Sequence, residues 1–191
     1  LAFDGTHIWV DNDWDDTLTK LRASDGVLVG TVPATNNPSD WLRGSSTQGS
    51  GLVFDGTHIW VSESTGSVSK LRASDGELIG TSRLSIFLGL GQDMVFDGTH
   101  IWVSDLLVAS RSSDTAGEID KIRVSDGRLV GTYSVGPKPF GLAFDGSYVW
   151  VATRGDDTVS RLRPSDGTIV GSYPVQGASE ILFDGEHIWA Y

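Results

Sequence analysis

The chain of 191 residues contains no cysteine, and Met94 is its single methionine. No disulfide framework, thiolate metal site or cysteine nucleophile can therefore be built from it. It also lacks an apolar run of the ~18 residues that a membrane-spanning helix needs, and no stretch keeps a helical spacing of apolar residues for long. These absences leave a chain made of strands, and they say nothing about the redox compartment.

Positive charge is also scarce. Lys and Arg together number 14 against 25 Asp and Glu, which gives a formal net charge of −11. Binding to nucleic-acid phosphates requires clustered Lys and Arg. We therefore expect no nucleic-acid partner.

What the chain does contain is one motif in five copies. The sequence F-D-G-T-H-I-W-V occurs three times unchanged and twice in altered form. The five phenylalanines recur every 39 to 51 residues, at Phe3, Phe54, Phe96, Phe144 and Phe183. Such a period is typical of solenoids, propellers and arrays, in which each unit buries its face against its neighbours.

A second motif, Ser-Asp-Gly, lies between copies of the first, at 24–26, 74–76, 125–127 and 165–167. Asp-Gly between apolar runs predicts a tight hairpin turn, because glycine tolerates positive φ. The least interrupted repeat then gives four short strands, rich in β-branched and aromatic residues, at 141–144, 148–151, 158–163 and 168–173. The sequence predicts an all-β fold, a β-propeller of four-stranded antiparallel blades.

Five first motifs but four Ser-Asp-Gly turns predict four complete blades plus half of a fifth. We expect one domain over 1–191, with blades at about 1–49, 50–91, 92–139 and 140–178 and a partial blade at 179–191. Propellers normally close their rings. We expect closure by a second copy of the chain, a homo-oligomer, or by sequence outside these residues, as in a fragment of a larger ring. A five-bladed monomer is the alternative.

The two faces of the disc differ in variability. The tight turns join the first strand to the second and the third to the fourth, so they share one face, while every insertion falls on the opposite face. Binding sites are commonly built on loops held by a rigid scaffold. We therefore place the functional surface on the variable face. Its candidate ligand-binding residues are Trp14, Trp41, Asp93, Asp105, Arg111, Arg154 and Glu180.

These candidates depart from the repeat. Trp14 and Trp41 are the tryptophans outside the motif, suited either to stacking on a ligand or to packing within loops. Asp93 and Glu180 stand where other copies have glycine. Residues repeated in every blade are expected to be structural instead. These are the motif tryptophans, the histidines at the turns, and the paired cations of the third strand, whose charges we expect to meet acidic turns such as Asp25.

A cation site is a weaker alternative. The acidic run 11–16 resembles the start of a calcium loop, but Asp16 and Arg22 stand where an EF-hand needs glycine and glutamate. The run could still form a looser calcium site, or Asp93, Asp105 and Glu180 could form one around the channel. Our expectation is no metal and no cofactor.

The order of these motifs resembles a known family. An inner strand, a D-G turn, I-W-V with a polar residue, the strand T-V-S-R-L-R (158–163) and an S-D-G turn are similar to the repeat of YVTN and NHL-type bacterial β-propellers, including the virginiamycin B lyase-like group. The resemblance implies a propeller fold and a secreted or periplasmic location. It does not specify an activity, since that family mixes ligand binders, surface proteins and a few enzymes.

We favour a non-enzymatic binding or scaffold module that uses the variable face to bind a protein, peptide or carbohydrate. The alternative is a metal-dependent lyase or lactonase-type enzyme with a carboxylate site at the channel mouth. The lyase-like relatives use histidine and glutamate with a divalent metal. All four histidines here follow tight turns, on the other face, so none is placed as a general base on the variable face.

Overall fold

The computed structural model describes residues 1–12, 15, 17–34, 51–63, 66–85, 89–107 and 116–191, with backbone alone at 89–92 and 105–107. The described residues form eighteen strands and no helix. No helix among them is therefore long and apolar enough to cross a membrane.

The strands form five antiparallel sheets, each ordered as in the chain. The first holds β1 (Ala2–Phe3), β2 (His7–Asn12), β3 (Thr17–Arg22) and β4 (Leu28–Pro33). The second holds β5 (Leu52–Phe54), β6 (His58–Glu63), β7 (Ser67–Arg72) and β8 (Leu78–Arg83). The third holds β9 (Gly89–Phe96), β10 (His100–Leu107), β11 (Ala116–Arg123) and β12 (Leu129–Pro137). The fourth holds β13 (Pro139–Phe144), β14 (Val149–Thr153), β15 (Thr158–Leu162) and β16 (Ile169–Pro174), and the fifth holds β17 (Ile181–Phe183) and β18 (Ile188–Ala190).

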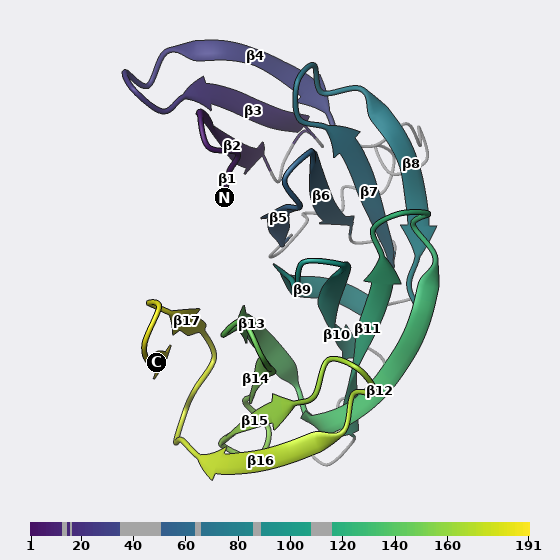
Figure 1. Ribbon diagram of the computed structural model, residues 1–191, viewed down its shortest axis with the longest axis vertical. Helices are drawn as coiled ribbons and strands as arrows, with labels where there is room; N and C mark the ends of the chain where they lie inside the picture. Colours follow the sequence, from purple (N-terminus) through teal and green to yellow (C-terminus); the bar gives the residue numbers. More distant parts are fainter. Residues whose placement is uncertain (13–14, 16, 35–50, 64–65, 86–88, 108–115) are drawn as a thin grey trace.

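The sheets are arranged as blades around an arc (Figure 1). The first strand of each sheet lies on the inside of the arc, and β4, β8, β12 and β16 form its outer rim. The all-β propeller prediction, with four complete blades and half of a fifth, is confirmed. Tight turns and inner strands fall where the two motifs placed them.

A buried core lies between each pair of adjacent blades, because strands of β-branched and aromatic residues bury both faces. The tryptophan of each complete blade packs forward onto the next blade. Trp9 lies with Ile59 and Leu71 of blade 2, and Trp60 lies with Ile101 and Ile122 of blade 3. Each blade therefore depends on its neighbour for its core, as the repeat period predicted.

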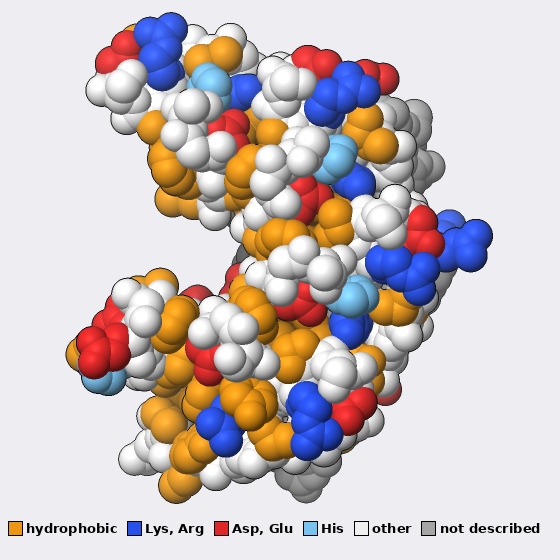
Figure 2. All heavy atoms as spheres, in the orientation of Figure 1, with side chains coloured by type: hydrophobic (Ala, Val, Ile, Leu, Met, Phe, Trp, Pro, Cys, Tyr) orange, Lys and Arg blue, Asp and Glu red, His pale blue; other side chains and the backbone are white. Residues whose placement is uncertain are grey.

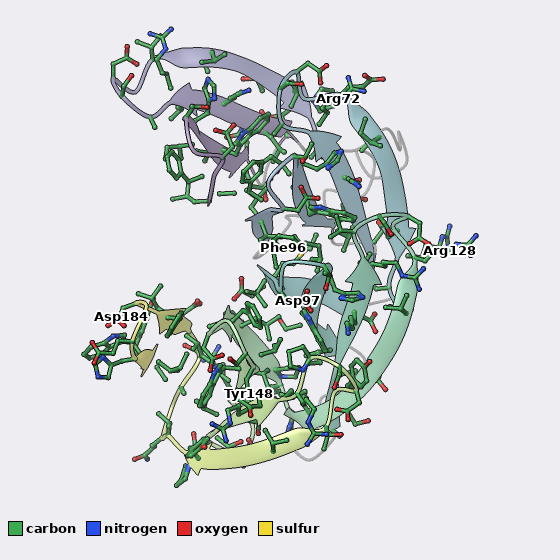
Figure 3. All side chains as sticks on the ribbon, in the orientation of Figure 1. Arg72, Phe96, Asp97, Arg128, Tyr148 and Asp184 are labelled. Carbon is green, nitrogen blue, oxygen red and sulfur yellow. The ribbon has the colours of Figure 1, made fainter. Side chains whose placement is uncertain are left out.

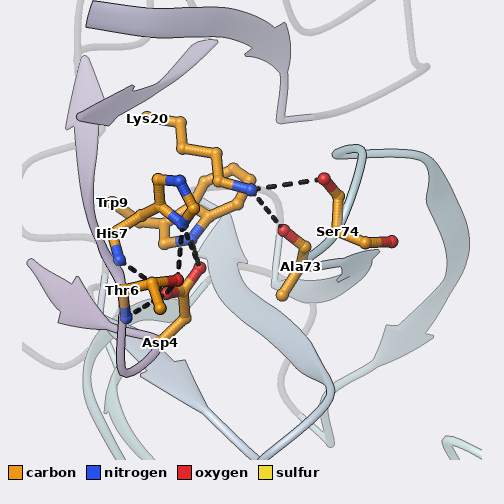
Figure 4. A network of polar contacts seen from close by, with 7 residues as sticks. All are labelled: Asp4, Thr6, His7, Trp9, Lys20, Ala73 and Ser74. Atoms are coloured by element: carbon orange, nitrogen blue, oxygen red, sulfur yellow. Dashed lines mark hydrogen bonds and ion pairs between the residues drawn. The ribbon is translucent and has the colours of Figure 1, made fainter. Parts of the chain in front are cut away.

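A polar network fixes each first turn to its tryptophan (Figure 4). Asp4 Oδ1 accepts hydrogen bonds from the backbone N–H groups of Thr6 and His7, and Oδ2 accepts one from Trp9 Nε1 at 2.9 Å. The same aspartate–tryptophan bond occurs in every blade, at 2.6 to 2.9 Å. Burial opposes ionisation of Asp4, yet these donors hold its pKa well below the usual value.

A lysine completes this network and joins it to the next blade. Lys20 Nζ lies 4.8 Å from the centre of the Trp9 ring and donates a hydrogen bond to the carbonyl oxygen of Ala73 at 2.6 Å. Lys70 and Lys121 repeat both contacts in blades 2 and 3. We call this unit the Asp–Trp–Lys stack.

The expectation for the paired cations is correct for one member of each pair. Arg22 contacts Asp25 of its own turn at 2.9 Å, and the equivalent arginine does the same in the other complete blades. The first cation does not meet an acidic turn. In blades 1 to 3 it lies over tryptophan and bonds a carbonyl oxygen of the next blade instead, because its position faces that blade rather than solvent. In blade 4 Arg161 also lies over its tryptophan, Trp150.

The packing predicts losses of stability that differ in size at two equivalent tryptophans. Trp60→Ala should lower the free energy of unfolding by about 3–5 kcal/mol, because it empties a packed site. Trp189→Ala should cost about 1 kcal/mol or less, because Trp189 is 56% exposed whereas Trp60 is fully buried. Urea denaturation of both variants checks this, and equal losses would contradict the packing described.

Candidate functional site

The turn face is regular, and its repeated histidines and arginines lie beside the aspartates of their own turns. Figure 2 views this face, with histidine side chains spaced along the arc beside acidic groups. His58 Nδ1 lies 3.3 Å from Asp55 Oδ2, and His7 Nδ1 lies 2.8 Å from Thr6 Oγ1. The histidines therefore belong to the turns, and no two come from one blade.

A shallow groove of about 410 Å³ lies on this face between blades 1 and 2. Its lining includes His7, Lys20, Phe54 and Arg72. The Lys20 ammonium is already bonded to the next blade, and Arg72 pairs with Asp75 at 2.8 Å. The groove thus follows from the junction of two blades and offers few free polar groups to a ligand.

The inner strands differ at one position. Gly51, Asp93, Gly141 and Glu180 occupy it in blades 2 to 5. A Cβ atom on Gly51 would come within 2.9 Å of the Met94 backbone nitrogen, and one on Gly141 within 2.7 Å of the Ser179 carbonyl oxygen. Glycine is therefore required where one inner strand lies against the next, and each acidic residue follows such a glycine around the arc.

Asp93 connects blades 3 and 4. Its Oδ2 accepts a hydrogen bond from the Leu142 N–H of β13 at 2.7 Å, and its Oδ1 accepts one from the Met94 N–H at 2.8 Å. Ser104 of β10 supports it, since Ser104 Oγ lies 3.0 Å from the Asp93 nitrogen and donates to the Phe140 carbonyl oxygen at 2.6 Å. The carboxyl group is thus held between two blades on the inside of the arc.

The environment of Asp93 opposes ionisation. Removal from water raises the pKa of Asp93 to about 6, although the N–H groups of Leu142 and Met94 act in the opposite direction. The negative charge of Glu180 raises it further. Asp93 therefore changes charge in a mildly acidic range, which ordinary surface carboxyl groups do not.

Glu180 lies directly before β17 on a paired backbone. Its N–H donates to the Tyr191 carbonyl oxygen at 3.1 Å, and the Tyr191 N–H donates back to Glu180 at 3.2 Å. The strand β13 lies between β9 and β17 on the inside of the arc (Figure 1). The acidic residues of blades 3 and 5 thus lie within β9 and directly before β17, on either side of β13, and the charge of Glu180 acts on Asp93.

Arg154 lies on the variable face of blade 4. Its guanidinium is 5.4 Å from the centre of the Phe140 ring, and its backbone N–H donates to Lys138. Lys138 and Asp157 both have φ of 54°, the left-handed region that non-glycine residues seldom adopt. Such conformations cluster at functional sites. Here one is at Lys138, which accepts the Arg154 N–H, and the other is three residues after Arg154 in the same loop.

The structure describes three of the seven candidates in full, Asp93, Arg154 and Glu180. The negative charge of Glu180 raises the pKa of Asp93. The Arg154 guanidinium lies against the ring of Phe140. The carbonyl oxygen of Phe140 accepts the hydrogen bond of Ser104 beside Asp93. Trp14, Trp41 and Arg111 lie outside the described residues. Asp105 is in β10, where its backbone pairs with Gly91 and Glu118, but its side chain is not described.

Sequence reasoning missed Phe140 and Ser104. Phe140 stands directly before the inner-strand Gly141, and Ser104 stands directly after the I-W-V of its repeat. These positions in the repeat were the signal that could have identified them.

No group of three or more His, Cys, Asp or Glu side chains that could hold a metal occurs among the described residues. The calcium site that includes Asp105 stays a prediction.

Comparisons with known proteins bear on the fold alone. No protein-family model matches the chain, and no curated protein matches it. Among solved structures it is similar to hydrazine synthase of Kuenenia stuttgartiensis, with a TM-score of 0.70 and 18% identity over 97% of this chain. The chain spans 52% of that structure's chain. Because 1087 chains of solved structures match, the likeness supports the propeller fold without assigning an activity.

The raised pKa of Asp93 predicts a pH-dependent stability. The folded-state pKa of about 6 exceeds the ordinary 3.8, so the folded state binds more protons between these values. Stability should fall as pH rises from about 4 to 6, by about 3 kcal/mol in total. Asp93→Asn should flatten this slope, as measured by urea denaturation at several pH values.

Comparing the stability curves of the parent protein and of Asp93→Asn separates the contribution of Asp93 from those of other titrating groups. The pKa of His100 is lowered, chiefly by burial, and its contribution has the opposite sign near pH 6 in both proteins. If the two stability curves run parallel between pH 4 and 6, the description of Asp93 is wrong.

Proposed function

We propose that this chain is a binding module whose ligand engages the inside of the arc at Asp93 and Glu180. The observation that carries the proposal is the Asp93 carboxyl group, fixed between two blades and kept from ionising readily by burial and by Glu180. A rigid acidic group of this kind is costly in the free protein, and a positively charged ligand group would relieve that cost.

The ligand class we favour is a protein or peptide that presents an amine or a guanidinium. A cation placed between Asp93 and Glu180 lowers the pKa of Asp93 and releases its proton. Arg154 and Phe140, on the same blade, would contact neighbouring parts of the ligand by stacking or ion pairing. Trp14, Trp41, Asp105 and Arg111 are proposed as further contacts from the variable loops. The family resemblance favours a secreted or periplasmic location.

A second candidate function rests on the same carboxyl pair. A carboxyl group with a pKa near 6 beside another carboxylate is also suited to general acid–base catalysis. A lyase or lactonase would use Asp93 as proton donor and Glu180 as its ionised partner. Assays with lactone and polyuronate substrates separate the two functions. Turnover that depends on Asp93 or Glu180 would favour the enzyme.

The binding function is tested by titrating a lysine-rich peptide and its acetylated form into the protein. Calorimetry in two buffers at pH 5.5 should show proton release on binding of the unmodified peptide alone. Glu180→Gln and Asp93→Asn should each weaken binding about tenfold or more, because each removes a charge partner.

The matched control is Asp126→Asn, which makes the same change of charge on the turn face, at an exposed pair with Arg123. It should leave affinity within about twofold. Equal weakening by all three variants would indicate a general effect of net charge, and the site at Asp93 and Glu180 would be excluded.

A further inference from the structure

The outer edge of β18 has no strand partner among the described residues, and β17 and β18 form a two-stranded sheet. We propose that this edge binds a β-hairpin with the pattern of the repeat's third and fourth strands, supplied from outside residues 1–191. Three groups around the edge match the groups that hold such a hairpin at the other blade junctions. The proposal concerns a different surface from Asp93 and Glu180 and does not depend on their function.

The first group is Arg161. At three junctions a lysine donates a hydrogen bond to the carbonyl oxygen directly before the next blade's Ser-Asp-Gly turn, which belongs to Ala73, Val124 or Pro164. Arg161 holds the same register opposite Trp150. Its Nε is buried and has no hydrogen-bond partner in the part of the chain that the structure describes. Buried donors are nearly always satisfied, so Arg161 points to a missing carbonyl oxygen of this kind.

The second group is Trp189. Its Nε1 donates to Asp184 at 2.6 Å, so the Asp–Trp part of the stack is already formed. In complete blades a cation of the third strand pairs across from this tryptophan, as Lys20 does with Trp9. Trp189 is 56% exposed whereas Trp9 is fully buried. A hairpin cation opposite Trp189 would complete the stack.

The third group is Tyr173. The equivalent residue of each preceding blade packs on the turn glycine of the next, with Tyr133 on Gly167. These turn glycines have positive φ, and a Cβ atom on Gly167 would lie 2.0 Å from the Tyr133 ring. For Gly26, the turn glycine of blade 1, no atom of the described residues lies within 4 Å of such a Cβ. Tyr173 is 41% exposed and is placed to receive another turn glycine.

Together the three groups define the partner. It has a cation to stack on Trp189, a carbonyl oxygen before Ser-Asp-Gly to accept from Arg161, and a turn glycine to pack under Tyr173. Backbone pairing with β18 supplies the remaining contacts, as in other cases of strand addition to an open sheet edge. The segment 67–83 of this chain has this pattern, S-V-S-K-L-R-A-S-D-G-E-L-I-G-T-S-R.

A synthetic peptide of residues 67–83 tests the proposal against the 191-residue protein labelled with 5-fluorotryptophan. Fluorine NMR should show a saturable shift of the Trp189 resonance, assigned with Trp189→Phe, while the Trp60 resonance stays in place. Hydrogen exchange of the β18 amides should slow on binding. The peptide carrying Gly76→Ala should bind at least tenfold more weakly, because its turn would clash with Tyr173.

Arg161→Gln should weaken peptide binding about tenfold, because a charge-assisted hydrogen bond is lost. The matched control is Arg163→Gln, two residues further along the chain and directly after β15, whose partner is Asp166 of its own turn. It should leave affinity unchanged, and circular dichroism of both variants confirms that they fold.

Absence of binding at millimolar peptide would overturn the proposal. So would binding that is insensitive to Arg161→Gln and to Gly76→Ala, since the register would then be wrong. Sedimentation of the free protein gives a further check. A dimer that protects β18 and resists the peptide would show that a second copy occupies the edge instead.

Discussion

The Asp–Trp–Lys stack is the interaction on which the rest of this fold depends. The aspartate of the first turn orients the indole, the indole supports the ammonium, and the ammonium bonds the backbone of the next blade. Each link alone is modest in strength. Because the stack crosses a blade junction beside a buried core, it fixes both the spacing and the register of neighbouring sheets (Figure 4). Figure 3 labels the turn aspartates of two other blades, Asp97 and Asp184.

This regular frame lets the inside of the arc depart from the repeat. Asp93 replaces a small residue with a carboxyl group that is largely shielded from water and lies near a second carboxylate. Such a group lowers stability when ionised. The surrounding N–H donors from Met94 and Leu142 limit that loss and hold the carboxyl group in one orientation. A carboxyl group that is held in one orientation and has a raised pKa is well suited to bind a cationic group.

The same frame explains why the two ends of the arc differ. Blade 1 packs its tryptophan onto blade 2 and carries its own third and fourth strands. The last sheet has the Asp184–Trp189 pair but no strand beyond β18 in the described chain. Trp189 and Tyr173 are therefore exposed at the last junction, and Arg161 Nε has no partner among the described residues. In the first three blades the equivalent tryptophan is fully buried and the equivalent lysine bonds the next blade. The difference arises from tertiary position, since the local sequences are nearly the same.

The sequence by itself determined the strands, the tight turns, the blade period and the division into a uniform and a variable face, because turn chemistry and alternation act over a few residues. It also marked Asp93 and Glu180 by their departure from glycine. The tertiary structure decided which groups meet. Asp93 bonds Leu142 forty-nine residues away, and Lys20 reaches a carbonyl oxygen fifty-three residues along. Such contacts depend on how blades stack, and no local pattern encodes a distance across a junction.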